Sequence, residues 1–173
     1  MTVYTASLAA RRLSGPDFDA PCAFGRAGLV TAADKREGDQ ASPIGTWPVR
    51  RMFHRTDRIN APCGAVRADP IAADDGWCDA PGHPAYNRLV RLPFKASHET
   101  LRREDGLYDL IVVLGHNDDP PAPGLGSAIF LHCALPDATD GLRPTAGCVA
   151  IPRDPLIRLA TRLAPGDAIA IAP

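Results

Sequence analysis

Residues 108–133 read YDLIVVLGHNDDPPAPGLGSAIFLHC and contain two short apolar runs, separated by a segment rich in glycine, proline, asparagine and aspartate. The run Leu110–Leu114 is apolar at every position, which is typical of a strand that is covered on both faces. Ser127–Cys133 is a second run of strand length, and the turn-forming residues between the two runs argue against one continuous helix. The stretch therefore predicts two strands of a buried sheet, Tyr108–Leu114 and Ser127–Cys133.

The same pattern of short apolar or β-branched runs between turn-forming clusters recurs along the chain. Proline supplies 18 of the 173 residues and glycine 15, which makes turns frequent and long helices unfavourable. The segment Pro70–Pro84 is so rich in Asp, Gly and Pro that it predicts a surface loop. We predict further strands at Val3–Leu8, Gly28–Ala32, Trp47–Phe53, Arg88–Leu92, Cys148–Ile151 and Ala168–Ala172.

Helical patterns are few. In the segment 154–163, Asp154 is placed to cap a helix, Pro155 suits its first position, and the leucines that follow share one face. A shorter helix is expected after Ser97, with Leu101 facing inward. These elements together predict a mainly β fold, a sandwich with one or two peripheral helices.

The length of 173 residues fits one domain, which we expect to span 1–173. A net charge of −1 leaves no basic field that would hold nucleic acid or anionic lipid. No apolar run approaches the length of a membrane span. Arg11 and Arg12 follow the short apolar stretch at the N-terminus, whereas a signal peptide has its basic residues first. We therefore expect a cytoplasmic protein, or a periplasmic one if a leader has been removed, and the sequence does not indicate the oligomeric state.

The cysteines and histidines carry the chemical signal. There are five cysteines, an odd number without a Cys-x-x-Cys pair, so a complete disulfide framework is impossible. His132 ends a predicted strand, and 15 residues rich in turn formers separate it from Cys148. A loop of this kind would let the strand that carries Cys148 return beside the strand that carries His132. The imidazole and the thiol would then come within about 3 Å, as nucleophilic cysteine catalysis requires.

A neighbouring histidine would explain how this cysteine could become a nucleophile. A thiol is mostly protonated near neutral pH, and a neighbouring imidazole can accept its proton. The backbone amides of Gly147 and Cys148 are candidates for an oxyanion site, and the Thr145 hydroxyl for orienting the histidine or binding substrate. The alternative is structural: Cys148 would be a small buried apolar residue and His132 a strand end.

The residues around the cysteine and the histidine resemble a known signature. In the L,D-transpeptidase (YkuD-type) catalytic domain family, a histidine is followed, after an interval of this length, by Ser/Thr-x-Gly-Cys. The resemblance runs from about residue 28 to 151, and its upstream parts agree with one bacterial branch of the family. The matching segments are GSAIFLH (126–132), PTAGCVAI (144–151), KREGD (35–39), SPIGT (42–46), GWCD (76–79) and YN (86–87).

The resemblance implies a β-sandwich enzyme that acts on peptidoglycan stem peptides or muropeptides, without a metal or organic cofactor. Cys148 would be the nucleophile, His132 the base, and the Gly147 and Cys148 amides the oxyanion donors. The enzyme would cleave the bond between the L-centre of diaminopimelate, or an equivalent third residue, and D-Ala. The acyl group would pass to water, as in an L,D-carboxypeptidase that recycles wall peptides, or to an amine, as in a transpeptidase.

The substrate contacts are less well defined. Many family members carry His where this chain has Ala146, and Arg or Asn where it has Ala150. Arg143 or Arg153 are candidates to bind a substrate carboxylate instead. Functional residues concentrate on loops, so polar and aromatic residues of the Pro/Gly-rich segments are further candidates. The substrate-binding set is then Trp77, Asp79, Tyr86, Asn87, His116, Asn117, Ser127 and Arg143.

Two other functions remain open. A zinc peptidase would need a metal site from residues such as Cys78, Asp79, His83 and His132, whose spacing matches no standard zinc motif. A non-catalytic module that binds wall peptides would keep the fold, and its Cys148 thiol would be no more reactive than the other four.

Overall fold

The computed structural model describes residues 1–138 and 141–173. It confirms the mainly β prediction, and each strand expected from the sequence is present, although β5 begins at Ser42, five residues before the predicted Trp47, and β11 begins at Phe130, three residues after the predicted Ser127. The sequence did not predict β2, β3, β6, β7 and β9. The described strands are β1 (Val3–Ser7), β2 (Arg12–Gly15), β3 (Phe18–Pro21), β4 (Leu29–Thr31), β5 (Ser42–His54), β6 (Ala68–Pro70), β7 (Asp75–Cys78), β8 (Leu89–Arg91), β9 (His98–Thr100), β10 (Leu110–Leu114), β11 (Phe130–Cys133), β12 (Val149–Ile151) and β13 (Ala168–Ala172).

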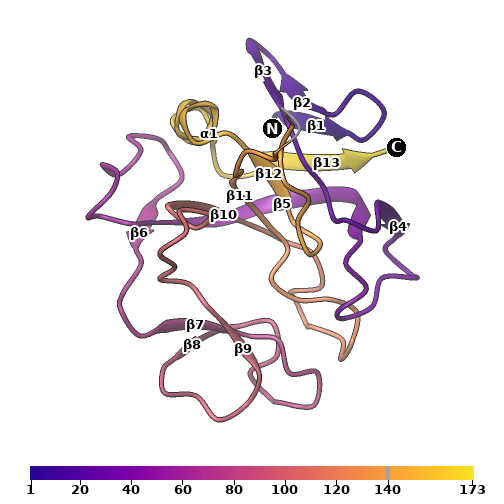
Figure 1. Cartoon of the computed structure of the whole chain (residues 1–173), viewed down its shortest axis with the longest axis vertical. Coiled ribbons are helices and arrows are strands. Elements are labelled where there is room, and N and C mark those ends of the chain that lie inside the picture. Colours follow the sequence, from indigo (N-terminus) through magenta and orange to yellow (C-terminus); the bar gives the residue numbers. More distant parts are fainter. Residues whose placement is uncertain (139–140) are drawn as a thin grey trace.

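The long strand β5 organises the main sheet (Figure 1). Its first part pairs with β13, and its second part pairs with β10. From there the order runs β13-β1-β2-β3 on one side and β10-β11-β12 on the other. These two groups of strands, here called the two wings of the sheet, pack face to face as a sandwich. Ala23, just after β3, exchanges hydrogen bonds of 2.8 and 3.0 Å with Ala150 of β12, so the outer edges meet and the sheet is nearly closed.

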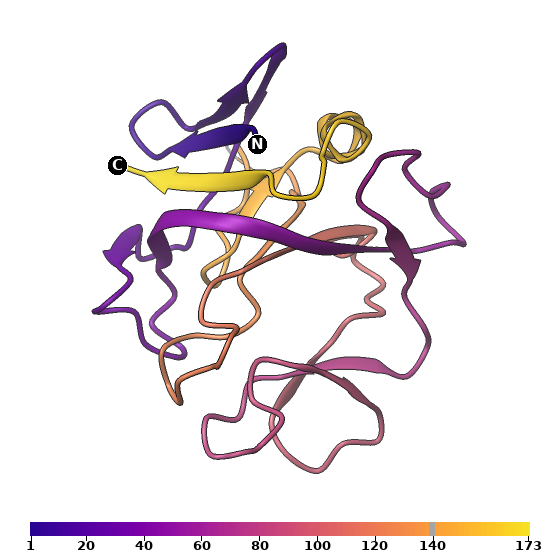
Figure 2. The same cartoon turned by 180° about the vertical axis from the view of Figure 1, so that it is seen from behind.

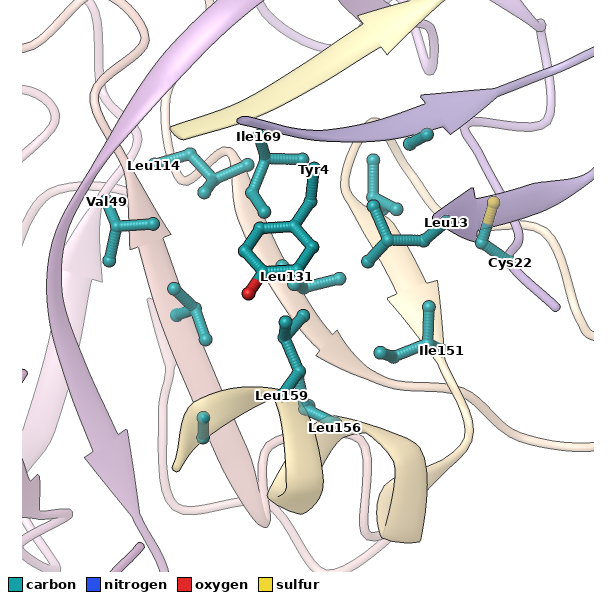
Figure 3. Packing of buried hydrophobic residues seen from close by; sticks show 14 of the residues in the cluster. Tyr4, Leu13, Cys22, Val49, Leu114, Leu131, Ile151, Leu156, Leu159 and Ile169 are labelled. Atoms are coloured by element: carbon teal, nitrogen blue, oxygen red, sulfur yellow. The ribbon is translucent and has the colours of Figure 1, made fainter. Parts of the chain in front are cut away.

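The principal hydrophobic core fills the space between the wings. Tyr4 and Leu13 of one wing face Leu131 and Ile151 of the other, as Figure 3 shows. Full burial of a leucine or isoleucine side chain stabilises a fold by about 1.5–3 kcal/mol. This core holds β11, which contains His132, and β12, which directly follows Cys148, in a fixed position.

The helix α1 (Arg153–Ala160) closes one end of this core through Leu156 and Leu159, which are fully buried as predicted. Its start differs from the prediction. Pro152 occupies the N-cap position, no side chain caps the helix, and Asp154 lies in the first turn. In the described part of the chain, no helix is long and apolar enough to cross a membrane.

A small antiparallel sheet of β8, β7 and β9 lies apart from the main sheet (Figures 1 and 2). Two predictions were wrong here: the loop over Pro70–Pro84 contains β7, and the segment after Ser97 forms β9 instead of a helix. Each of these short strands pairs with a segment distant in sequence. Leu101 faces inward as predicted and is fully buried.

A second apolar cluster fills the space between the small sheet and the main sheet. It contains Trp77 from β7, Phe130 from β11, Tyr108 and Cys148. The Trp77 and Phe130 rings meet edge to face, with centroids 5.1 Å apart. The small sheet thus covers the region in which Cys148 lies.

Candidate active site

Cys148 lies directly before β12, which runs parallel to β11 and pairs His132 with Ala150. Its side chain is almost buried, with the residue 8% exposed. The thiol donates a hydrogen bond to the Ala128 carbonyl at 3.1 Å, and the Phe130 N–H points at the sulfur at 3.4 Å. The residues just before and at the start of β11 therefore fix the position of the sulfur.

Cys148 stands at the end of a tight turn that begins at Thr145. Thr145 Oγ1 donates to the Cys148 carbonyl at 2.7 Å and accepts from the Gly147 N–H at 3.1 Å. Ser42 Oγ, from β5, also donates to the Cys148 carbonyl, at 3.2 Å. Gly147 has a φ of +148°, and a Cβ there would lie 3.1 Å from the Ala41 carbonyl oxygen, so the turn requires glycine.

This turn corrects two of the predicted roles. The Gly147 N–H is engaged with Thr145 Oγ1 and is not free to face an oxyanion. The Thr145 hydroxyl donates to the Cys148 backbone, so it shapes the turn instead of orienting His132. The sequence placed both residues at the site correctly, but the short spacing between them lets the threonine side chain bond within its own turn.

His132 lies on the same face of β11 as Phe130, and the Tyr108 ring meets both rings edge to face, at 5.3 and 6.0 Å between centroids. Its Nδ1 lies 2.9 Å from the Cys133 carbonyl oxygen. A carbonyl oxygen can only accept, so this contact assigns the proton to Nδ1. The Nε2 atom is therefore unprotonated and able to accept a proton.

The resting pair is neutral. Burial, and to a smaller extent the charge of Glu99, raise the pKa of Cys148 to about 12, against the opposing effects of the Phe130 N–H and of Lys35. Burial also lowers the pKa of His132 to about 4. At neutral pH the site therefore holds a thiol and a neutral imidazole.

Glu99 and Tyr108 are site residues that the sequence did not reveal. The Tyr108 hydroxyl donates to Glu99, and burial and the Glu99 charge hold the pKa of Tyr108 well above its usual value. Burial also raises the pKa of Glu99. Arg103 lies over the Tyr108 ring, 5.3 Å from its centroid. No motif marks these residues, because β9 and the segment before β10 reach the site only in the folded chain.

Cys148 is reached from a larger and a smaller cavity. The larger cavity, about 690 Å³, is lined by His132, Tyr108, Thr145, Arg103 and Arg143 as well as Cys148. The smaller cavity, about 320 Å³, is lined by Glu37, Asp79, Glu99, Ser127 and Gly147 as well as Cys148. His132 lines the larger cavity and is absent from the wall of the smaller one. The walls of the two cavities overlap at Arg26, Glu99, Ala146 and Cys148.

The sequence as a whole matches the model of the L,D-transpeptidase catalytic domain (YkuD) over residues 3–171. The chain belongs to this family. No curated protein matches the sequence.

Solved structures of L,D-transpeptidases resemble the chain at low sequence identity. L,D-transpeptidase 1 from Mycobacterium tuberculosis is 14% identical with a TM-score of 0.42, and the match covers 99% of this chain and 62% of that one. An L,D-transpeptidase from Mycobacterium smegmatis is 13% identical with a TM-score of 0.46, covering 98% and 58%. L,D-transpeptidase 3 from M. tuberculosis is 13% identical with a TM-score of 0.45, covering 98% and 60%. The chain thus spans about three fifths of the length of these proteins.

In this L,D-transpeptidase domain, several predicted substrate-binding residues serve the scaffold instead. Asn87 is buried, and its side chain joins four groups: Nδ2 donates to the His116 and Asn117 carbonyls, and Oδ1 accepts from Trp77 Nε1 and the Ala128 N–H. Ala128 has a φ of +52°, an unfavourable backbone conformation for alanine. Asn87 therefore supports the strained residue whose carbonyl holds the Cys148 thiol.

Two more of the predicted residues, His116 and Asn117, are engaged away from Cys148. His116 Nε2 contacts the Leu125 carbonyl oxygen at 2.9 Å, and Asn117 Nδ2 donates to the Ala122 and Gly126 carbonyls. The Tyr86 hydroxyl donates to Glu37. The structure describes all eight predicted substrate-binding residues. Three of them line a cavity at Cys148: Asp79, Ser127 and Arg143. Arg153, the alternative to Arg143, pairs with Asp109 at 3.3 Å.

The side chains of the hypothetical zinc site do not come together. Among the described residues, no three His, Cys, Asp or Glu side chains are placed to hold a metal ion. All five cysteines lie in the described residues and are unpaired, and Cys148 shares the wall of the larger cavity with two histidines, His132 and His98.

Proposed function

We propose that this protein is a cysteine acyltransferase that acts on peptidoglycan stem peptides. The observation that carries the proposal is the arrangement of Cys148 and His132 on the wall of one cavity, with His132 Nε2 left unprotonated by the Nδ1 contact to Cys133. Membership of the L,D-transpeptidase family supports the choice of substrate.

In the first step, the Cys148 thiol gives its proton to His132 Nε2, and the sulfur attacks the carbonyl carbon of the third stem residue. The carbon–nitrogen bond to D-Ala then breaks, and the imidazolium returns the proton to the departing amine. A thioester on Cys148 and free D-Ala remain. The neutral resting pair suits this route, because the thiolate is needed only as the attack begins.

In the second step, His132 removes a proton from the acceptor, which attacks the thioester carbon. The carbon–sulfur bond breaks, and Cys148 regains its proton. Because leaving group and acceptor both exchange protons with His132, both belong in the larger cavity. Arg143 is exposed on its wall, and in the described part of the chain it takes part in no ion pair, so it supports binding of the D-Ala carboxylate.

The acceptor follows the compartment. A cytoplasmic enzyme would meet soluble muropeptides, and we propose water as its acceptor, which makes it an L,D-carboxypeptidase of wall recycling. An exported enzyme would meet the polymer, and an amine would then be the acceptor, giving a crosslink or an exchanged D-amino acid.

The test uses the purified protein, a diaminopimelate-containing tetrapeptide muropeptide and an excess of a D-amino acid, with products followed by mass spectrometry. Loss of D-Ala alone indicates a carboxypeptidase, and replacement by the added amino acid indicates a transpeptidase. Cys148→Ala should abolish both. If the native protein leaves the muropeptide unchanged and no thioester forms on Cys148, the protein is a binding module and the proposal fails.

A further inference from the structure

The imidazole of His132 is restrained by more than its one hydrogen bond. The Nδ1 contact with the Cys133 carbonyl, at 2.9 Å, selects the tautomer and joins one atom of the ring to the backbone. A general base must also keep its free nitrogen directed at the groups with which it exchanges protons. The Tyr108 ring meets the imidazole edge to face, with centroids 5.3 Å apart and the planes inclined at 76°. Tyr108 therefore adds a second restraint.

The backbone fixes Tyr108 beside this histidine. The Cys133 N–H donates to the Leu107 carbonyl at 3.0 Å. The residue before Tyr108 is thus bonded to the residue after His132. From there β10 and β11 pair as antiparallel strands, with Ile111 opposite His132. The tyrosine therefore enters the site on a segment that is hydrogen-bonded to the strand of the histidine.

The side chain of Tyr108 is held at its hydroxyl and over its ring. The hydroxyl donates to Glu99, and the Arg103 guanidinium lies 5.3 Å from the ring centroid. Arg103 is itself paired with Asp105 at 2.5 Å. Tyr108 is only 6% exposed, so water competes little with these contacts. They restrain the ring independently of any substrate.

The same ring also packs against the support of the nucleophile. Tyr108 meets the Phe130 ring edge to face, with centroids 6.0 Å apart. The Phe130 N–H in turn points at the Cys148 sulfur at 3.4 Å. One side chain thus packs against His132 and against the residue that holds the cysteine. A shift of this ring would change the relation between the base and the nucleophile.

We propose that Tyr108 is a positioning residue, whose ring holds the imidazole of His132 in the orientation needed for proton exchange in the larger cavity. Glu99 and Arg103 hold the ring in turn, and all four residues line that cavity. The inference rests on the proposed function only for the use that the reaction makes of His132. Misplacing a reacting group by about 1 Å can cost roughly 100-fold in rate, so loss of the ring affects kcat more than binding.

The first test is kinetic and separates the ring of Tyr108 from its hydroxyl. Tyr108→Leu removes the ring, and we expect kcat for release of D-Ala to fall about 10- to 100-fold while KM stays within about threefold. Tyr108→Phe keeps the ring and should restore kcat to within about threefold of the native value. Equal losses in the two variants would assign the effect to the hydroxyl, and a rise in KM at unchanged kcat would make Tyr108 a substrate contact. Either result would overturn the proposal.

The second test follows His132 itself and needs no turnover. Proton–nitrogen NMR of the labelled protein reports the tautomer and the pKa of each histidine, and His132→Asn identifies the signal. In the native protein the His132 signal should show a proton on Nδ1 and a pKa of about 4, because burial lowers it. In Tyr108→Leu the imidazole should exchange between tautomers and titrate closer to about 6.5, whereas Tyr108→Phe should keep the native signal.

Tyr4→Leu is the matched control for loss of a buried tyrosine. Tyr4 is 4% exposed, packs against Phe18 in the principal core and lies on the wall of neither cavity at Cys148. This variant should lower stability without changing kcat or the His132 signal.

Glu99 offers a milder test should Tyr108→Leu fail to fold. Glu99→Ala keeps the tyrosine ring but removes its anchor, so the His132 signal should move in the same direction by a smaller amount. Glu99→Gln can still accept from the Tyr108 hydroxyl and should keep the native signal. A native His132 signal in folded Tyr108→Leu, or in Glu99→Ala where the leucine variant does not fold, would overturn the positioning role.

The two proposals can fail separately. If the native protein releases no D-Ala but the His132 signal changes in Tyr108→Leu, the restraint on the imidazole is supported and the acyltransferase is refuted. If the native protein and folded Tyr108→Leu release D-Ala equally fast, the enzyme is supported and the positioning role is refuted.

Discussion

Acidification should destabilise the protein through His132, because the fold holds this imidazole neutral. Burial lowers its pKa to about 4, whereas a histidine in an unfolded chain titrates near 6.5. Between these values the unfolded chain binds a proton that the folded chain does not. The contribution of this group to stability is therefore complete above pH 6.5 and is lost as the pH falls toward 4. At about 1.36 kcal/mol per pKa unit the full loss is roughly 3 kcal/mol, of which about 2 kcal/mol is lost by pH 5.

The assay is urea unfolding at pH 7 and pH 5, for the native protein and for His132→Asn. Asparagine does not titrate, and its side-chain amide can still donate to the Cys133 carbonyl, as His132 Nδ1 does. Other titrating groups affect both proteins alike and cancel in the comparison. We expect the native protein to lose about 2 kcal/mol more than the variant between the two pH values. Parallel losses would show that His132 has an ordinary pKa, and the description of a neutral resting pair would then be wrong.

Substitutions at three positions test the scaffold of the site. Asn87→Leu should cost roughly 2–4 kcal/mol in urea unfolding and slow thioester formation, because four groups lose their partner; unchanged acylation would contradict its supporting role. Gly147→Ala should slow acylation at least about tenfold in a burst assay, since the added methyl meets Ala41 and the positive φ disfavours alanine. Thr145→Val should cost about 1–3 kcal/mol, whereas Thr145→Ser should cost less than about 1 kcal/mol, because serine keeps the hydroxyl that bonds to Gly147 and Cys148; equal losses would assign the effect to packing.

Most strands of the main sheet could be predicted because they carry their signal locally, whereas the short strands β2, β3 and β6 were missed. Leu110–Leu114 is apolar throughout, and the structure buries every position between β5 and β11. The strand β7 carries no such signal. It begins with Asp75 and Gly76, and it is buried because β8 and β9 pair with it from both sides. Asp75 is held there by an ion pair with Arg91 at 2.6 Å, a partner that a local pattern cannot indicate.

The residues of the site divide in the same way, into those with a local sequence signal and those without one. His132 and Cys148 could be found because the sequence presents a strand-end histidine, a loop and a Gly-Cys turn within 17 residues. Glu99 and Tyr108 could not, since they belong to the small sheet and to the segment before β10, and only folding brings them together. Asn87 was recognised as important, but the chemistry of an asparagine does not distinguish a substrate contact from a buried hydrogen-bonding hub.

Glu99 opposes ionisation of the nucleophile. Its charge stands next to burial among the causes that raise the pKa of Cys148, so it disfavours the thiolate. In the proposed reaction the thiolate is therefore formed only as the proton leaves for His132, and the neutral pair is the state from which the attack begins.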